Sequence, residues 1–196
     1  MKPLILASGS PRRAKILHDL GVEFEIVKTE APEVLIPHDP VRTVTENACA
    51  KLHAAAVAQE RDPPVAVATS CAPPEVAGRA ILAADTIVWF DNRIYGKPRD
   101  LDEAREFLRE LSGNVHTVFT GVACDGDVKI ARSDVRFRKL GEAMIEEYVK
   151  RVHPTDRAGA YDIDESGDLI VEGYTGSYEN IMGLPVEPLR EWGIVE

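Results

Sequence analysis

The sequence is poor in the features that mark membrane-spanning, secreted and nucleic-acid-binding proteins. None of its apolar runs approaches the length that spans a bilayer. The amino-terminal stretch before the first polar turn is too short for the apolar region of a signal peptide. The formal net charge of −10 argues against broad contact with DNA, RNA or an anionic membrane. We therefore expect a cytoplasmic protein with neither nucleic acid nor membrane as a partner.

Cysteine and histidine are too few and too scattered for the sites that they usually build. Cys49, Cys71 and Cys124 are odd in number and form no CxxC pair. They predict free thiols in a reducing compartment, without a metal-binding or nucleophilic role. The five histidines lack metal-ligand spacing, and no Gly-x-Ser-x-Gly elbow is present. The sequence therefore predicts neither a zinc site nor a serine-hydrolase triad.

Apolar strand-like segments alternate with amphipathic helix-like segments along the chain, a pattern typical of α/β architecture. A length of 196 residues, with 44% of them hydrophobic, allows one well-cored domain or one domain with two lobes. No internal repeat and no interdomain linker is visible in the sequence. Residues 1–196 are therefore expected to form a single α/β domain.

Strand and helix patterns can be placed along most of the chain. Asp100 is expected to cap a helix, with Glu103 placed for a capping box. Asp125-Gly126-Asp127 is expected to turn a hairpin. The proline-rich residues 62–79 predict an irregular surface loop. We expect strands at 3–7, 23–28, 80–90, 93–95, 115–124, 128–138 and 168–173, and helices at 11–20, 41–60, 101–111, 141–151 and from about 186.

The segment Ser8-Gly9-Ser10-Pro11-Arg12-Arg13 carries the first functional signal. It joins the strand at 3–7 to a helix with proline at its first position, where the missing N–H costs nothing. Free amides at the helix start and two guanidinium groups suit a phosphorylated ligand. The alternative is an ordinary strand-to-helix turn with solvated arginines, because short motifs often match by chance. In an acidic chain, a phosphate site at this turn has to be local.

Asp85 carries the second signal, because it interrupts the apolar run Ala80–Phe90. An unpaired carboxylate there would be costly and would tend to protonate, a difficulty that a bound cation or a neighbouring lysine would remove. The alternative is that Asp85 faces solvent from one side of a half-exposed strand. Lys51, Lys97 and Glu33, each taken alone, look like surface residues.

Two loops combine small residues with polar side chains, which lets a backbone approach a ligand closely. They are residues 156–161 and residues 176–185. Glycine-rich turns that pack one lobe against another would have the same composition. Each loop taken singly therefore leaves both interpretations open.

Short segments stand in order along nearly the whole chain, and together they are more specific than any one of them. They are Ala7–Arg13, Asn47–Lys51, Ala84–Thr86, Gly96–Pro98, Leu111–Gly113, His116–Gly121, Arg157–Tyr161 and Gly183–Pro185. In this order they resemble the Maf family of nucleoside triphosphate pyrophosphatases. The resemblance implies a two-lobed α/β fold of the Maf and ITPase type, with a long mixed sheet, flanking helices and a central nucleotide cleft.

The resemblance also implies an activity and roles for residues. The activity is hydrolysis of a nucleoside triphosphate between the α and β phosphorus atoms with a divalent cation, Mg²⁺ or Mn²⁺, whose oxygen ligands and retained waters suit such a site. Asp85 would be the catalytic carboxylate, as proton acceptor for the attacking water or as a metal ligand, and Glu33 would help to hold the cation. The residues expected to grip the triphosphate are Ser8, Arg12, Arg13, Lys51 and Lys97.

The residues at three positions of the family motifs are expected to differ between subgroups that prefer different bases. Arg12 and Thr86 resemble the subgroup that acts on dTTP and UTP. Where that subgroup reads Gly-Ile-Gln, this chain reads Asp-Ile-Asp at 162–164, and an ionised Asp164 accepts hydrogen bonds but donates none. The usual lysine before Ala-Gly is Arg157, which keeps the charge with a different geometry. Arg12, Thr86 and Asp164 are thus the expected specificity residues.

The leading hypothesis is a metal-dependent pyrophosphatase that removes dTTP, UTP or modified pyrimidine triphosphates. The alternative is a nucleotide-binding regulatory protein with weak or lost catalysis, linked to cell division through the association of the family with septum formation. Nucleic-acid binding through the basic helix start is a third reading, which the acidic net charge disfavours. A homodimer is a further expectation from the resemblance.

Overall fold

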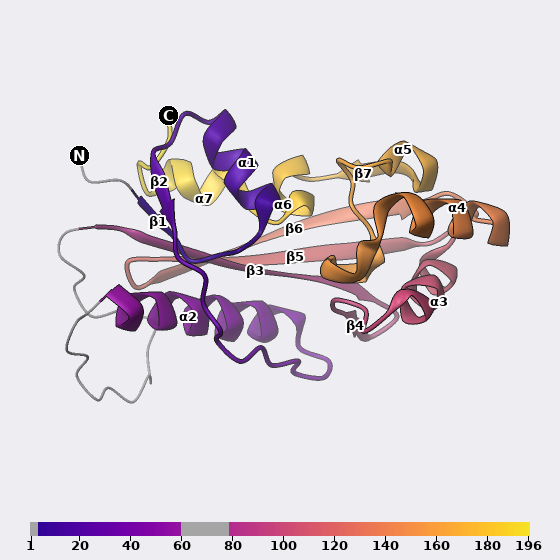
Figure 1. Ribbon diagram of the computed structural model, residues 1–196, viewed down its shortest axis with the longest axis horizontal. Coiled ribbons are helices and arrows are strands. Elements are labelled where there is room, and N and C mark those ends of the chain that lie inside the picture. Colours follow the sequence, from indigo (N-terminus) through magenta and orange to yellow (C-terminus); the bar gives the residue numbers. More distant parts are fainter. Residues whose placement is uncertain (1–3, 60–78) are drawn as a thin grey trace.

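The computed structural model describes residues 4–59 and 79–196, so all but the last residue of the loop expected at 62–79 lies outside the described residues. Within these residues, seven strands form one mixed sheet in the order β2-β1-β3-β5-β6-β7, with β4 pairing to β3 (Figure 1). β2 and β3 run parallel to β1, whereas the other pairs are antiparallel. The expected α/β fold with a long mixed sheet is confirmed. The strands are β1 Leu4–Leu6, β2 Phe24–Ile26, β3 Ile81–Phe90, β4 Arg93–Tyr95, β5 Val115–Cys124, β6 Asp127–Phe137 and β7 Val171–Thr175.

Helices cover both faces of the sheet (Figure 1). One long helix, α2, lies along one face, while α1, α6 and α7 lie on the other. The helices α3 and α4 pack together near the hairpin of β3 and β4. No helix in the described part of the chain has both the length and the apolar content needed to cross a bilayer. The helices are α1 Pro11–Asp19, α2 Pro40–Gln59, α3 Leu101–Leu111, α4 Glu142–Val152, α5 Gly167–Ile170, α6 Tyr178–Met182 and α7 Val186–Glu191, with 3₁₀ turns η1 Pro154–Asp156 and η2 Ala158–Ala160.

Successive residues of β3 point to opposite faces of the sheet, as strand geometry requires. Ile81 and Ala83 pack in the core beneath α2, whereas Leu82 and Ala84 pack in the core shared with α1, α6 and α7. The same alternation puts the side chain of Asp85 on the α2 face and the next side chain on the face of α1. The strand therefore delivers two neighbouring polar side chains to two different sets of partners.

A glycine lets α2 come close to the sheet beside Asp85. Gly121 of β5 is the register partner of Asp85 across the antiparallel pair. A Cβ at Gly121 would lie 2.7 Å from the carbonyl oxygen of Val44 on α2, which is closer than carbon and oxygen atoms pack. The glycine therefore allows the depth at which α2 packs, and with it the reach of α2 side chains toward β3.

The caps and turns predicted from the sequence are largely confirmed. Asp100 caps α3 by accepting hydrogen bonds from two amides of the first turn. Glu103 does not complete a capping box with Asp100, because its carboxylate accepts from the amide of Arg99 at 2.7 Å. Asp125 and Gly126, with φ of 45° and 88°, turn the hairpin between β5 and β6.

The carboxyl-terminal part of the chain departs from the expectation. The strand predicted at 168–173 is wrong in its first half, because residues 167–170 form α5 and β7 begins at Val171. Helix α6 lies in a segment expected to be loop. Its signals are in the sequence, since Ser177 caps it and Gly183 ends it with a φ of 103°.

The expectation of a free thiol is wrong for Cys49 on α2, which is disulfide-bonded. The expectation for Cys71 lies outside the described residues. Cys124 at the end of β5 is a free and buried thiol. Burial raises the pKa of Cys124 to about 12, so this thiol is protonated and unreactive at neutral pH.

Candidate active site

A cleft opens along one edge of β3. On this edge β3 pairs with β1 at Ile81 and Leu82 and with β4 from Val88 onward, and no strand among the described residues pairs with the stretch between. The cleft has a volume of about 460 Å³. Its walls come from β3, from the turn before α1, from α2 and from the loop around η2. The gap in the sheet therefore brings distant parts of the sequence to one place.

The turn before α1 lines the cleft from Ala7 to Arg13. Ser10 is the N-cap residue of α1 but makes no side-chain capping bond, and Pro11 follows it at the first helical position. The amides of the first turn thus lack a capping side chain, and they carry the positive end of the helix dipole. The predicted strand, turn and helix are confirmed, and the arrangement suits an anion.

Arg13 is buried at the base of this turn, with a relative exposure of 9%. Its Nε donates to the carbonyl oxygen of Gly183 at 2.8 Å, and its two Nη atoms donate to Ser8 Oγ at 3.0 Å and Thr86 Oγ1 at 3.1 Å. Burial lowers the pKa of Arg13 to about 10, although the negative charge of Asp85 opposes this shift. Arg13 remains charged at neutral pH and ties α1 to β3 and to the end of α6.

These contacts leave one hydrogen on Ser8 for a ligand. Ser8 Oγ accepts from Arg13 Nη1 at 3.0 Å and from the amide of Ser10 at 3.2 Å. A hydroxyl has two acceptor lone pairs and one hydrogen, so both acceptor positions of Ser8 are in use. Since Ser8 lines the cleft, its hydrogen can be donated to an acceptor there.

Thr86 has the opposite polarity toward the cleft. Its Oγ1 accepts from Arg13 and lies 3.0 Å from Thr120 Oγ1. Thr120 donates its one hydrogen to the carbonyl oxygen of Asn180 at 3.2 Å, so Thr86 is the donor between the two threonines. The hydrogen of Thr86 is therefore used within the protein, and Thr86 offers the cleft a lone pair.

Asp85 is buried, with a relative exposure of 5%, and both of its oxygens are bonded. Oδ1 accepts from Lys51 Nζ at 2.6 Å, and Oδ2 accepts from Asn47 Nδ2 at 3.0 Å. Asn47 and Lys51 lie one turn apart on α2 and so share a face of that helix. The alternative that Asp85 faces solvent is wrong, and a neighbouring lysine compensates the carboxylate.

Lys51 also links Asp85 to Glu33. Its Nζ lies 2.8 Å from Glu33 Oε1, and Lys97 Nζ lies 3.4 Å from the same oxygen. Burial raises the pKa of Glu33, but the hydrogen bond and charge of Lys51, followed by those of Lys97, bring its net pKa below the ordinary value. Glu33 is thus ionised at neutral pH, and negative and positive groups alternate. We call Asp85, Lys51, Glu33 and Lys97 the lysine cluster.

Glu33 and Asp85 are the residues that could hold a divalent cation. Within residues 4–59 and 79–196, no group of three or more His, Cys, Asp or Glu side chains is arranged to hold a metal ion. Mg²⁺ is commonly held by one or two carboxylates, with waters and substrate phosphates completing its shell. Lys51 already lies between the two carboxylates, so positive charge is accommodated there. The donor set therefore fits Mg²⁺ or Mn²⁺ that arrives with a phosphate ligand.

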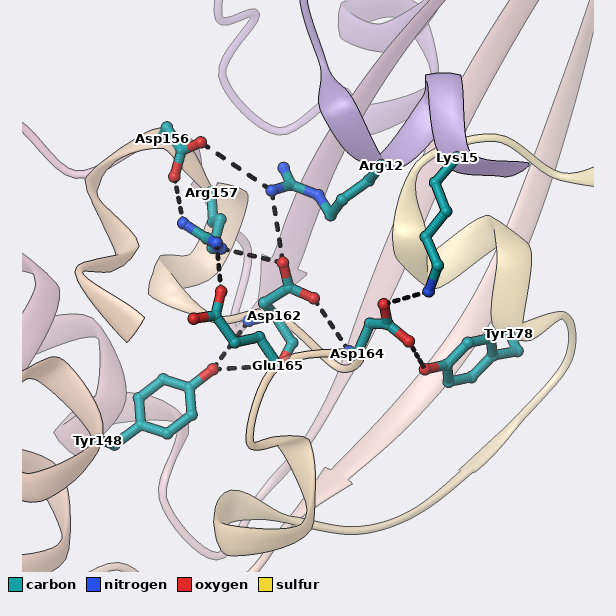
Figure 2. A network of polar contacts seen from close by, with 9 residues as sticks. All are labelled: Arg12, Lys15, Tyr148, Asp156, Arg157, Asp162, Asp164, Glu165 and Tyr178. Atoms are coloured by element: carbon teal, nitrogen blue, oxygen red, sulfur yellow. Dashed lines mark hydrogen bonds and ion pairs between the residues drawn. The ribbon is translucent and has the colours of Figure 1, made fainter. Parts of the chain in front are cut away.

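A second polar group on the cleft wall brings two arginines to one carboxylate (Figure 2). Arg157 Nε donates to Asp162 Oδ2 at 3.0 Å, and Arg12 Nη1 reaches the same oxygen at 3.4 Å. The side chain of Asp162 is 4% exposed. Asp156 also lies between the two arginines, but its side chain is 61% exposed. We call Arg12, Arg157 and Asp162 the arginine cluster; all three line the cleft.

Asp164, the third expected specificity residue, has other partners (Figure 2). Its Oδ2 accepts from Lys15 Nζ at 2.6 Å, and its Oδ1 accepts from the hydroxyl of Tyr178 at 3.1 Å. None of these three residues is among those that line the cleft. The role of Asp164 in base preference stays a prediction. The other expected site residues meet at the cleft: Ser8, Arg12, Arg13, Glu33, Lys51, Asp85, Thr86 and Lys97.

Three residues at the cleft have no role predicted from the sequence, namely Asn47, Arg157 and Asp162. Asn47 could have been found, because it precedes Lys51 by four positions in a predicted helix. The partnership of Asp162 with Arg12 has no local signal, since the two stand 150 positions apart.

Comparison with known proteins gives one consistent result. Residues 3–192 match the family of Maf-like proteins. A dTTP/UTP pyrophosphatase of Chromobacterium violaceum is 41% identical over 188 residues, which cover 93% of this chain and 89% of the relative. Proteins of the same name from Clostridioides difficile and Bacillus cytotoxicus are 39% and 37% identical; the matches cover 96% of this chain and 92% and 93% of the relatives.

Proposed function

The chain belongs to the Maf family, and from that premise we propose that it hydrolyses dTTP and UTP to the monophosphate and pyrophosphate. The names of the relatives support this reaction. They also favour hydrolysis over the alternative of a binding protein without catalysis. Water adds across the anhydride between the α and β phosphorus atoms, one P–O bond forms while another breaks, and pyrophosphate leaves.

The observation that carries the proposal is the lysine cluster in the same cleft as the start of α1. Two carboxylates and two lysines alternate there at distances of 2.6 to 3.4 Å. A triphosphate needs cationic partners along its length, and the amides of the first turn of α1 add positive potential. The lysines would bind phosphate oxygens, and the hydrogen of Ser8 would be donated to one of them.

Asp85 is suited to take the proton of the attacking water. Lys51 and Asn47 donate to its two oxygens, so the carboxylate is oriented and largely out of bulk solvent. A positioned base of this kind typically contributes a factor of about 10² to 10⁴ to the rate. Asn47 donates its amide hydrogen without adding charge and so holds the orientation of the carboxylate.

A divalent cation, Mg²⁺ or Mn²⁺, would be held by Glu33 and Asp85. When bound, it would neutralise charge on the phosphate oxygens. The chain itself contributes two carboxylates. Burial raises the pKa of Glu33, and Lys51, followed by Lys97, brings it below its ordinary value. The cation requirement is tested by adding a chelator, which is expected to stop pyrophosphate release, and by restoring Mg²⁺ or Mn²⁺.

The polarity of Thr86 supports a uracil or thymine base. Thr86 offers the cleft a lone pair, because its own hydrogen is used within the protein. Uracil and thymine carry a ring N3–H that can donate to such an acceptor, whereas the N3 atom of cytosine is itself an acceptor. Thr86 is thus matched to the ring N3–H of dTTP and UTP, whereas CTP could meet it only through its exocyclic amino group.

The test is a panel of UTP, dTTP, CTP, GTP and ATP, incubated with the purified protein and Mg²⁺, with the products separated. We expect UTP and dTTP to give the monophosphate and pyrophosphate fastest. Release of orthophosphate, or no turnover of any triphosphate, would refute the proposal. Tight binding of UTP without products would favour the regulatory alternative. The expected homodimer and cytoplasmic location stay predictions.

A further inference from the structure

Asp162 is the most deeply buried carboxylate of the network in Figure 2, and its oxygens are bonded on several sides. Its Oδ2 receives two guanidinium groups, from Arg12 and Arg157. Its Oδ1 accepts from the amide of Asp164 at 2.9 Å, which fixes the plane of the carboxylate. The side chain is held on the cleft wall and cannot turn away without breaking these bonds.

The two arginines come from separate parts of the fold. Arg12 is in the first turn of α1, whereas Arg157 lies between η1 and η2. Two guanidinium groups this close repel one another unless a carboxylate lies between them. Asp156 also contacts both, but it is exposed, and exposed ion pairs are screened by water. Asp162 is therefore the buried charge that keeps the two arginines together.

The contacts of Arg12 leave part of its fork for a ligand. Its approaches to Asp162 and to Asp156 both use Nη1. The other nitrogens of Arg12 are not needed for these two contacts, and Arg12 lines the cleft. A guanidinium presents its donors in a fixed fork, so anchoring one nitrogen sets the direction of the others.

We propose that Asp162 is a positioning residue for nucleotide binding in this cleft: it holds Arg12 beside Arg157 so that the remaining donors of Arg12 face acceptor oxygens of the nucleotide. This inference rests on the proposed nucleotide substrate. The acceptor oxygens are either the carbonyl oxygens of the base or those of the phosphates. Asp164 cannot take this part in its present position, because it binds Lys15 and Tyr178 outside the cleft.

The central test compares two carboxylates that stand two positions apart. Asp162→Asn removes the charge with little change in shape and is expected to release Arg12. Asp164→Asn makes the same change on the carboxylate outside the cleft. It tests the alternative that Asp164, the residue expected from the sequence, governs nucleotide binding. Asp19→Asn is the matched control, because it removes a carboxylate from the last residue of α1, far along the helix from Arg12.

For Asp162→Asn we expect the KM for UTP to rise about tenfold, the effect of one lost charge-assisted hydrogen bond, with kcat changed less than about threefold. Calorimetry with the non-hydrolysable α,β-methylene analogue of UTP should give the same loss of affinity. The analogue separates the two proposals, because its binding can be measured even if no triphosphate is hydrolysed. A protein that binds the analogue through Asp162 but releases no pyrophosphate would refute only the proposed function.

The source of the acceptor oxygens is resolved by two further measurements. If the arginines contact the base, Asp162→Asn lowers the ratio of kcat/KM for UTP to that for CTP. If they contact phosphate, the losses for UTP and CTP are equal, and inhibition by inorganic pyrophosphate weakens by the same factor. Either result supports a positioning role for Asp162.

Folding is checked by melting each variant, and Asp162→Glu serves if Asp162→Asn does not fold. Asp162→Glu keeps the charge and should recover most of the affinity for the analogue, which a purely structural role would not predict. Two outcomes would overturn the inference: affinities of Asp162→Asn equal to those of Asp19→Asn, or a loss of affinity in Asp164→Asn as large as that in Asp162→Asn.

Discussion

The lysine cluster and the arginine cluster both place charge in the same cleft, but they do so in different ways. In the lysine cluster, ammonium groups alternate with carboxylates, and one lysine serves two acids. In the arginine cluster, two guanidinium forks share one buried acid. An ammonium group is a point charge that can turn toward a new partner, whereas a guanidinium keeps its direction.

The difference suggests a division of labour. The lysine cluster can change partners when phosphates and a cation arrive, because its lysines have rotatable donors. In the arginine cluster, Asp162 holds both guanidinium groups in place, so the cluster suits a ligand contact with one fixed direction. Arg13 connects the turn before α1 to β3, since its guanidinium donates to Ser8 of the turn and to Thr86 of β3.

The largest effect is expected from breaking the lysine cluster at Asp85. Asp85→Asn keeps the shape but cannot take a proton, so pyrophosphate release from UTP should fall by about 10³-fold. Asp125→Asn is the control, because Asp125 lies in an exposed turn with a φ of 45° that asparagine adopts well. A near-normal kcat in Asp85→Asn would show that the carboxylate does not take a proton in the reaction.

The next effect concerns His116, a buried histidine that bonds Tyr161, the neighbour of Asp162 in the chain. Tyr161, beside Asp162, bonds His116 Nε2 through its hydroxyl at 2.9 Å. Burial lowers the pKa of His116 from 6.5 to about 3. The unfolded chain binds a proton on this histidine more readily than the folded protein between those values, so stability is present above pH 6.5 and falls as the pH drops toward 3.

The size of this effect is up to about 1.4 kcal/mol for each pH unit in that window. His116→Gln removes the titration, so its free energy of unfolding should fall less steeply than that of the wild type, as urea denaturation at several pH values would measure. His18→Gln, on the exposed end of α1, is the control. Parallel curves for wild type and His116→Gln would count against the buried neutral histidine.

A smaller effect is expected from Arg13→Lys, which tests whether Arg13 joins α1 to β3. Lysine can satisfy only part of the set of acceptors that the fork now holds, and an unsatisfied buried acceptor costs about 1–3 kcal/mol. The free energy of unfolding in urea should fall by about 2 kcal/mol, and the KM for UTP should rise. A variant with wild-type stability would show that the fork is not needed to join α1 to β3.

The smallest effect is expected at the edge of the lysine cluster. Lys97 is the weaker of the two cations that lower the pKa of Glu33, after Lys51. In Lys97→Met that pKa should rise, so the acidic limb of the kcat/KM profile should move to higher pH. Lys150→Met on the exposed face of α4 is the control. If the acidic limb of the kcat/KM profile does not move, Glu33 is not the group whose titration governs activity.

Much of the fold could be predicted because its signals are local. Proline after Ser10 starts α1, and Asp100 starts α3. The prediction failed where the segments are short. The polar loop before β7 contains a four-residue helix, and α6 has only five residues. In such segments no full period of the apolar pattern is present to separate helix from strand.

The site could be predicted from the sequence only where a charged side chain stands among apolar residues. Asp85 stands out in an apolar strand, so a compensating partner could be expected before its identity was known. Asp162 stands in a polar loop, where a carboxylate attracts no notice. The structure alone distinguishes it from Asp164, because backbone turns, and not residue types, decide which of two nearby acids faces the cleft.

The sequence by itself determined the alternation that sends Asp85 and Thr86 to opposite faces of β3, because a strand has a period of two whatever packs against it. It also determined the helix start that lines the cleft. Only the tertiary structure decided that Lys51 compensates Asp85 and that Arg12 meets Asp162. Those contacts join residues 34 and 150 positions apart, and ion pairs over such separations depend on how the elements pack.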